Sequence, residues 1–122
     1  MRDTLITVLM LTIAIIHLLP VAGMLSVERL HELYQIEIND KDLEILMRHR
    51  AALFGILGLF IAYAAFTPML QPIAFVVAFL SLASFFYLSL SVGDYNPAIR
   101  RVVMADIVAA ICLLGAVMLY LL

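Results

Sequence analysis

The sequence predicts an all-α protein, an integral membrane bundle of four antiparallel helices with a short amphipathic interfacial helix between the first two. The first observation is composition. Of 122 residues, 66% are hydrophobic and 13% charged, whereas soluble domains are roughly 45–50% apolar and about 25% charged. Such an excess cannot be buried in so small a domain, because much of its surface stays exposed. The second observation is four apolar runs near the ~20 residues that span a bilayer. The third is their short connections, which favour one up-down-up-down domain over residues 1–122.

The first span covers residues 4–24. A secretory signal is the alternative, because Val21-Ala22-Gly23 resembles a cleavage site. We favour a span, because the only basic residue before the apolar run is Arg2. One helical face carries most of its small and polar residues, namely Asp3, Thr7, Met10, Ala14, His17 and Val21. Membrane helices turn such residues toward each other, so we expect His17 to face inward, with a kink at Pro20.

Residues 26–36 differ in kind. Apolar and charged side chains alternate there in a helical rhythm, which predicts a short amphipathic helix on the membrane surface. The polar run that follows contains Asn39 and Asp40, and either can cap the next helix.

The second span covers residues 41–66. Its small residues form one stripe, Ala51, Gly55, Gly58, Ala62 and Ala65. Arg48 continues this stripe, Arg50 lies about 100° away and His49 nearly opposite, by the 3.6-residue period. We therefore predict that Arg48 points inward, that Arg50 lies on the flank, and that His49 faces headgroups or a partner chain.

The third and fourth spans cover residues 73–92 and 97–121. Pro68 and Pro72 bracket the turn before the third span, and Pro97 suits the first turn of the fourth. The predicted small face of the third span is Ala74, Ala78, Ser81, Ser84, Leu88 and Ser91, with Tyr87 beside it. That of the fourth span is Ala105, Ala109, Cys112 and Ala116, with Asp106 beside it.

The basic residues predict sidedness. Loops one and three, with the adjoining helix ends, hold Arg29, Lys41, Arg48, Arg50, Arg100 and Arg101, against Arg2 at the other end. Cytoplasmic loops carry the Lys and Arg excess. We expect a multi-pass protein of the bacterial inner (plasma) membrane, with loops one and three cytoplasmic and both termini outside.

Four ionisable residues are predicted to lie at one depth. Counting ~1.5 Å per residue from the loop-side helix ends places His17, Arg48, Arg50 and Asp106 at a similar level. Each costs about 2.5–3.5 kcal/mol to insert, so such groups pair and face inward. We predict an Arg48–Asp106 ion pair. The full set of candidate ligand-binding residues is His17, Arg48, Arg50, Tyr87, Arg100 and Asp106.

Several functions fit this cluster. It either pins the bundle, binds a lipid or hydrophobic small molecule in a pocket below residues 26–36, or meets another subunit of a homo-oligomer or larger membrane complex. The alternative is a small enzyme acting on a lipid-like or quinone-like substrate, with Asp106 and His17 as the candidate catalytic acid–base pair. The first class, binding or accessory, is the reading we favour.

The sequence lacks the residues that metal, haem or nucleic-acid binding would need. No metal-ligand cluster or pair of facing histidines is predicted, so we expect no metal and no cofactor. The net charge of −2 does not suggest nucleic acid. Cys112 is the one cysteine, which we interpret as a small apolar side chain.

The segments LHELYQIEI, LEILMRHRAALFGILGLF and GDYNPAIRRVVMAD resemble an uncharacterised family of small four-helix bacterial membrane proteins over nearly the full length. Members often carry the label phosphopantetheine adenylyltransferase. The chain lacks the Gly-His phosphate motif and the alternating strands and helices of that soluble enzyme. The helix plan also loosely resembles DoxX-like proteins and, more faintly, trimeric membrane glutathione transferases. The latter carry Asn and Glu where this chain has Leu53, Phe54 and Gly55. The resemblance implies the fold and a membrane location.

Overall fold

The computed structural model describes residues 1–122, which form helices and no strands. In order these are α1 (Arg2–Leu18), the 3₁₀ helix η1 (Leu19–Met24), α2 (Val27–Tyr34), α3 (Lys41–Ala65), the 3₁₀ helix η2 (Pro68–Leu70), α4 (Gln71–Val92) and α5 (Pro97–Leu121). Four segments are long and apolar enough to cross a membrane, with mean hydropathies from 1.6 to 2.6. The predicted all-α bundle of four long helices and one short amphipathic helix is confirmed.

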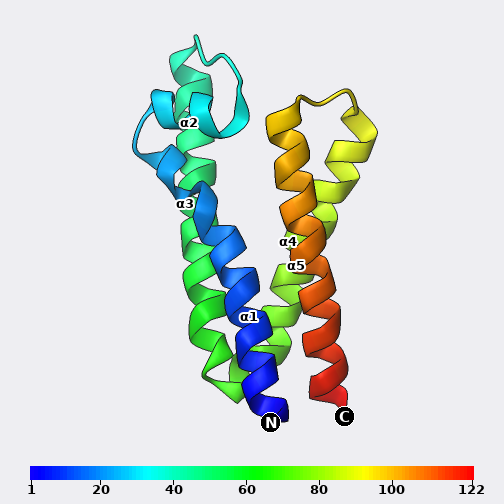
Figure 1. Ribbon diagram of the computed structural model, residues 1–122. Coiled ribbons are helices and arrows are strands. Elements are labelled where there is room, and N and C mark those ends of the chain that lie inside the picture. Colours follow the sequence, from blue (N-terminus) through cyan, green and yellow to red (C-terminus); the bar gives the residue numbers. More distant parts are fainter.

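The long helices alternate in direction, with both termini and η2 at one end and α2 at the other (Figure 1). Helix α1 packs against α3 and α5, and α4 packs against α5 and α3, so the four form a closed ring. Many large apolar side chains point outward, among them Leu59 and Leu114, each 65% exposed. Such a surface suits lipid, which solvates apolar side chains on all sides of the bundle.

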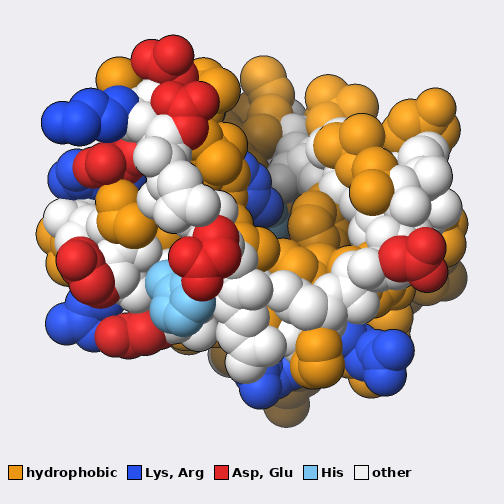
Figure 2. Space-filling model, turned by 90° about the horizontal axis from the view of Figure 1, so that it is seen from above, with side chains coloured by type: hydrophobic (Ala, Val, Ile, Leu, Met, Phe, Trp, Pro, Cys, Tyr) orange, Lys and Arg blue, Asp and Glu red, His pale blue; other side chains and the backbone are white.

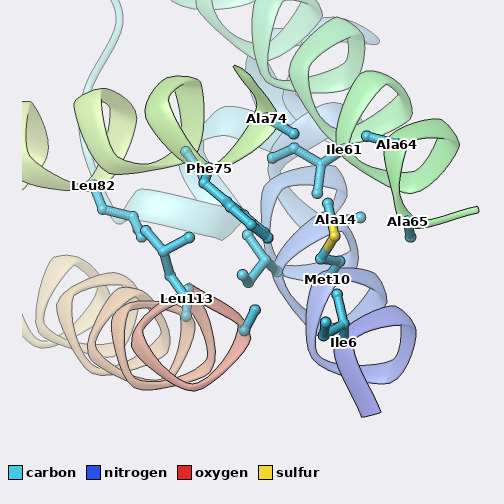
Figure 3. Close-up of a cluster of buried hydrophobic side chains, with 14 residues drawn as sticks. Ile6, Met10, Ala14, Ile61, Ala64, Ala65, Ala74, Phe75, Leu82 and Leu113 are labelled. Carbon is cyan, nitrogen blue, oxygen red and sulfur yellow. The ribbon is translucent and has the colours of Figure 1, made fainter. Parts of the chain in front are cut away.

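The hydrophobic core lies toward the terminal end of the bundle. Side chains from all four long helices meet there (Figure 3), among them Met10, Ile61, Phe75 and Leu113. At the opposite end the helices diverge. Seen from that end, the molecule is hollowed between the side that carries α2 and α3 and the side that carries α4 and α5 (Figure 2).

Local sequence sets the helix ends. The side chains of Ser26, Asp40 and Asn96 accept hydrogen bonds from the backbone N–H groups of Arg29, Asp42 and Ile99, as helix caps do. Pro20 lies where α1 gives way to η1, since proline removes a backbone donor and disfavours a continued α-helix. Helix α2 ends at Tyr34, two residues before the predicted end, because Gln35 adopts the left-handed conformation with φ 53°.

The predicted stripes of small residues are buried where two helices pack against each other. Met10, Ala14 and His17 of α1 are buried, as are Ala51, Gly58 and Ala65 of α3. On α4 only the first part of the predicted face is buried, and the prediction for Ser84, Leu88 and Ser91 is wrong because all three are exposed. These positions lie toward the end where α4 separates from α3, so no helix covers them.

Candidate functional site

A cavity of about 280 Å³ lies between the end of α1, η1, α2, α3 and α5. Its wall is part apolar, with Ile16, Leu33 and Phe54 among the lining residues. Its polar lining consists of His17, Glu32, Tyr34, Arg50, Arg101 and Asp106. We call these six residues and the space between them the polar cavity. Arg50 and Asp106 are half-buried, whereas Glu32 and Arg101 are exposed at its rim.

Arg50 is held in place from two sides. Its Nη1 donates to the Tyr34 hydroxyl at 3.0 Å, and its guanidinium carbon lies 4.6 Å from the centre of the Phe54 ring. A cation over an aromatic face is stabilised by about 0.5–2 kcal/mol, more when water is excluded. Arg50 thus carries a fixed charge into the cavity, and most of its five N–H donors remain for a ligand.

His17 is 3% exposed and both its ring nitrogens are engaged. Nδ1 lies 3.0 Å from the carbonyl oxygen of Ile13, which only accepts, so Nδ1 carries a proton. Nε2 lies 3.0 Å from the Ser81 hydroxyl of α4 and, with the proton on Nδ1, accepts a hydrogen bond from it. The ring also packs against Phe54, with centroids 5.8 Å apart. Because neither nitrogen is free, the geometry gives no support to His17 as the acid–base partner of Asp106.

The predicted ion pair between Arg48 and Asp106 is wrong. Arg48 instead contacts Glu44 on its own helix, Nη1 to Oε2 at 3.0 Å. Its Nε and Nη2 donate to the carbonyls of Met24 and Leu25 at 2.8 and 3.2 Å. The last carbonyls of a helix lack intrahelical partners. Those at the end of η1 therefore accept hydrogen bonds from Arg48. The arginine that reaches the cavity is Arg50, predicted only on the flank.

Two other predicted residues lie outside the cavity. Tyr87 is 70% exposed on the separated part of α4, and Arg100 is exposed at the start of α5 and does not line the cavity. His49 is exposed, as predicted. Of the six candidate binding residues, His17, Arg50 and Asp106 line the polar cavity, whereas Arg48, Tyr87 and Arg100 do not.

Three cavity residues were missed, Glu32, Tyr34 and Arg101. A signal for Arg101 exists in the sequence. The small face of α5 through Ala105 and Ala109 reaches Arg101 and Ala98 when continued backwards at helical spacing, whereas Arg100 lies about 100° away. Glu32 and Tyr34 carry no such signal, because their place depends on how α2 folds back over the bundle.

The rest of the molecule contains other cavities but no metal-binding cluster. An apolar groove of about 730 Å³ runs between α4 and α5 on the outer surface, with Phe79 and Leu114 in its wall. No three side chains of the histidine, cysteine, aspartate and glutamate types come together in a way that would hold a metal ion. A second cavity with polar lining, of about 640 Å³, lies at the terminal end and includes Arg2 and Asp3, but these two side chains form an ion pair with each other. The polar cavity instead combines enclosed space with charged side chains, Arg50 and Asp106, that form no ion pair.

No protein-family model, no curated protein and no solved structure matches this chain.

Proposed function

We propose that this protein binds a membrane lipid, or a hydrophobic small molecule of similar build, with the polar end of the ligand in the polar cavity. The observation that carries the proposal is a cavity whose wall contains charged side chains without ion-pair partners. Arg50 and Asp106 line the same cavity, yet the three ion pairs of the protein join Arg2 to Asp3, Arg29 to Glu32 and Arg48 to Glu44.

Membrane insertion makes this arrangement informative. Ionisable groups within a bundle normally pair with one another, because each is costly in hydrocarbon. A bridge between Arg50 and Asp106 would close the cavity and indicate a purely structural role. Here both line the cavity and no ion pair joins them, so a ligand with a polar end would satisfy both groups.

The apolar part of the ligand has a route to the bilayer. Leu19, in the wall of the cavity, is 62% exposed on the outer surface of the bundle. Ile16 and Pro20 continue that wall and are half-buried. An acyl chain leaving the cavity over these side chains would pass over an apolar wall to the outer surface.

Native mass spectrometry of the protein released from mild detergent tests the proposal. The wild-type protein should retain an adduct of lipid mass. Arg50→Gln should lose most of it, and Arg100→Gln, which removes the same charge outside the cavity, should retain it. A protein without an adduct, or an adduct that Arg50→Gln leaves intact in a folded protein, would overturn the proposal.

A further inference from the structure

The charges around the polar cavity are balanced, and the balance restricts the ligand. Two basic residues, Arg50 and Arg101, and two acidic residues, Glu32 and Asp106, line it. Neither arginine has a carboxylate partner within the protein. The ion pair of Glu32 is with Arg29, at 3.8 Å, and both side chains are more than half exposed, so this pair holds Glu32 weakly.

A singly charged ligand fits such a wall poorly. A simple anion on Arg50 would leave the Asp106 carboxyl, which lines the same small space, without a partner. A simple cation on Asp106 would leave Arg50 without a partner in the same way. Each arrangement leaves a charged group incompletely paired at low dielectric, which is costly. A ligand that carries both signs satisfies the two groups at once.

The side chains also distinguish between kinds of cation. Quaternary ammonium groups are recognised by the open faces of aromatic rings. The aromatic faces here are Tyr34 and Phe54, and Arg50 already lies over both, 5.4 and 4.6 Å from their centroids. Carboxyl groups remain as the cation-binding elements, and these accept hydrogen bonds from N–H donors. A primary ammonium provides such donors and a trimethylated one does not.

The guanidinium groups determine the anionic part. Arg50 presents its remaining N–H donors in a planar fork, and forks of this kind bind phosphate with two parallel hydrogen bonds. Arg101 and Asp106 both line the cavity from α5, with Arg101 about 7.5 Å further along the axis toward the α2 end of the bundle. The two acids and the two bases therefore line one headgroup-sized space of about 280 Å³.

On the basis of the proposed lipid-binding function, we infer that the ligand has a zwitterionic head that combines a phosphate with a primary ammonium group. The phosphate lies against Arg50 and Arg101, and the ammonium lies against Asp106, with Glu32 at the rim. Acyl chains, where the ligand is a lipid, leave along Leu19. A soluble phosphoethanolamine has the same head chemistry and uses the same contacts.

The test is a competition measured by native mass spectrometry. The protein is equilibrated in detergent with equal amounts of phosphatidylethanolamine, phosphatidylglycerol and phosphatidylcholine of identical chains. Wild-type protein should retain the ethanolamine lipid about tenfold over each of the others, a difference of about 1.4 kcal/mol. Addition of soluble glycerophosphoethanolamine identifies the source, because displacement of the lipid indicates that the head alone suffices and retention indicates a requirement for the chains.

Two variants separate this inference from the proposed function. Asp106→Asn should still retain lipid but should no longer prefer phosphatidylethanolamine over phosphatidylglycerol. Arg50→Gln should reduce the retention of both lipids. Glu32→Gln, on the exposed rim, should weaken the preference and serves if Asp106→Asn does not fold. Lipid retention that depends on Arg50 but shows no headgroup preference would overturn the inference alone. Retention independent of Arg50 would overturn the proposed function.

Discussion

The Tyr34 hydroxyl of α2 accepts a hydrogen bond from the Arg50 guanidinium of α3 at 3.0 Å. Tyr34 is 3% exposed and Arg50 is half-buried, so the bond is partly buried. It joins the short surface helix to a long helix at the level of the polar cavity. The surface helix therefore orients the charge that the cavity presents, as well as covering the end of the bundle.

Replacing Tyr34 by Phe removes this acceptor and keeps the ring. A typical intramolecular hydrogen bond contributes about 1 kcal/mol, so we expect the melting temperature in detergent to fall by a few degrees. Arg50 stays over Phe54 in this variant, and lipid retention should fall less than in Arg50→Gln. Circular dichroism melts and native mass spectra measure the two effects. An unchanged melt with wild-type retention would show that the bond contributes nothing.

Asn96 joins α5 to the end of α2. Its Nδ2 donates to the carbonyls of Tyr34 and Gln35 at 2.7 and 3.1 Å, while its Oδ1 caps α5 by accepting from Ile99 at 2.8 Å. Asn96→Asp preserves the cap acceptor and removes the donor, whereas Asn96→Ala removes both.

We expect both Asn96 variants to speed hydrogen exchange at residues 34–38, because the contact from α5 is lost in each. Only Asn96→Ala should also speed exchange in the first turn of α5, with the loss of about 0.5–2 kcal/mol typical of a missing cap. Equal protection of residues 34–38 in wild type and Asn96→Asp would show that the two carbonyl contacts do not hold α2 in place.

Arg48 has a structural role that can be separated from binding. Its bonds to the Met24 and Leu25 carbonyls and to Glu44 fix the end of η1 on α3. Hydrogen bonds to charged groups contribute about 1.5–3 kcal/mol, and the half-buried position places Arg48 at the lower end. We expect Arg48→Gln to lower the melting temperature and to leave lipid retention unchanged. A loss of retention in protein that melts normally would instead place Arg48 in the binding site.

The contrast between Arg48 and Arg50 shows what the sequence predicts and what it does not. Helix length, caps and the inward face of His17 are local properties of the chain, so composition and spacing predict them. Arg48 and Arg50 lie about 200° apart around α3, so only one of them can face the cavity. Which arginine faces the cavity depends on the carbonyls at the end of η1, because these accept hydrogen bonds from Arg48.

The position of α2 also depends on contacts between residues that are far apart in the sequence. The amphipathic pattern predicts a surface helix, but it does not indicate which side chains reach back into the bundle. Tyr34 reaches Arg50 because Gln35 ends α2 in the left-handed conformation and Asn96 holds the carbonyls that follow. The prediction that the whole small face of α4 packs against a neighbouring helix is wrong for a related reason. The small residues continue along α4 past the point where α3 moves away.

Sidedness is open to a direct test. The excess of arginine and lysine at the α2 end predicts that this end is cytoplasmic. In a Cys112→Ser background, Asn39→Cys should resist a membrane-impermeant maleimide in intact cells and react after lysis. Thr67→Cys, at the η2 end, should react in intact cells. The reverse pattern would place α2 and the polar cavity on the outer side of the membrane.

Gly58 sets the distance between α1 and α3. A Cβ at this position would lie 2.7 Å from Leu18 Cγ and 3.1 Å from the backbone oxygen of Ala14. Replacing Gly by Ala inside a helix normally gains about 1 kcal/mol, but here the backbone contact prevents the helices from accommodating the methyl group. Overpacking of this kind costs about 1–3 kcal/mol, so we expect Gly58→Ala to melt lower than wild type.

Gly115→Ala is the matched control for this prediction. Its Cβ would lie 3.3 Å from Leu9 Cδ1, the far end of a flexible side chain that can move aside, so its melting temperature should equal or exceed that of wild type. Because Leu18 adjoins His17, a wider spacing between α1 and α3 should also disturb the packing of His17 on Phe54 and reduce lipid retention. If Gly58→Ala melts like Gly115→Ala, the close approach of α1 to α3 is not what positions His17 and Phe54 around the cavity.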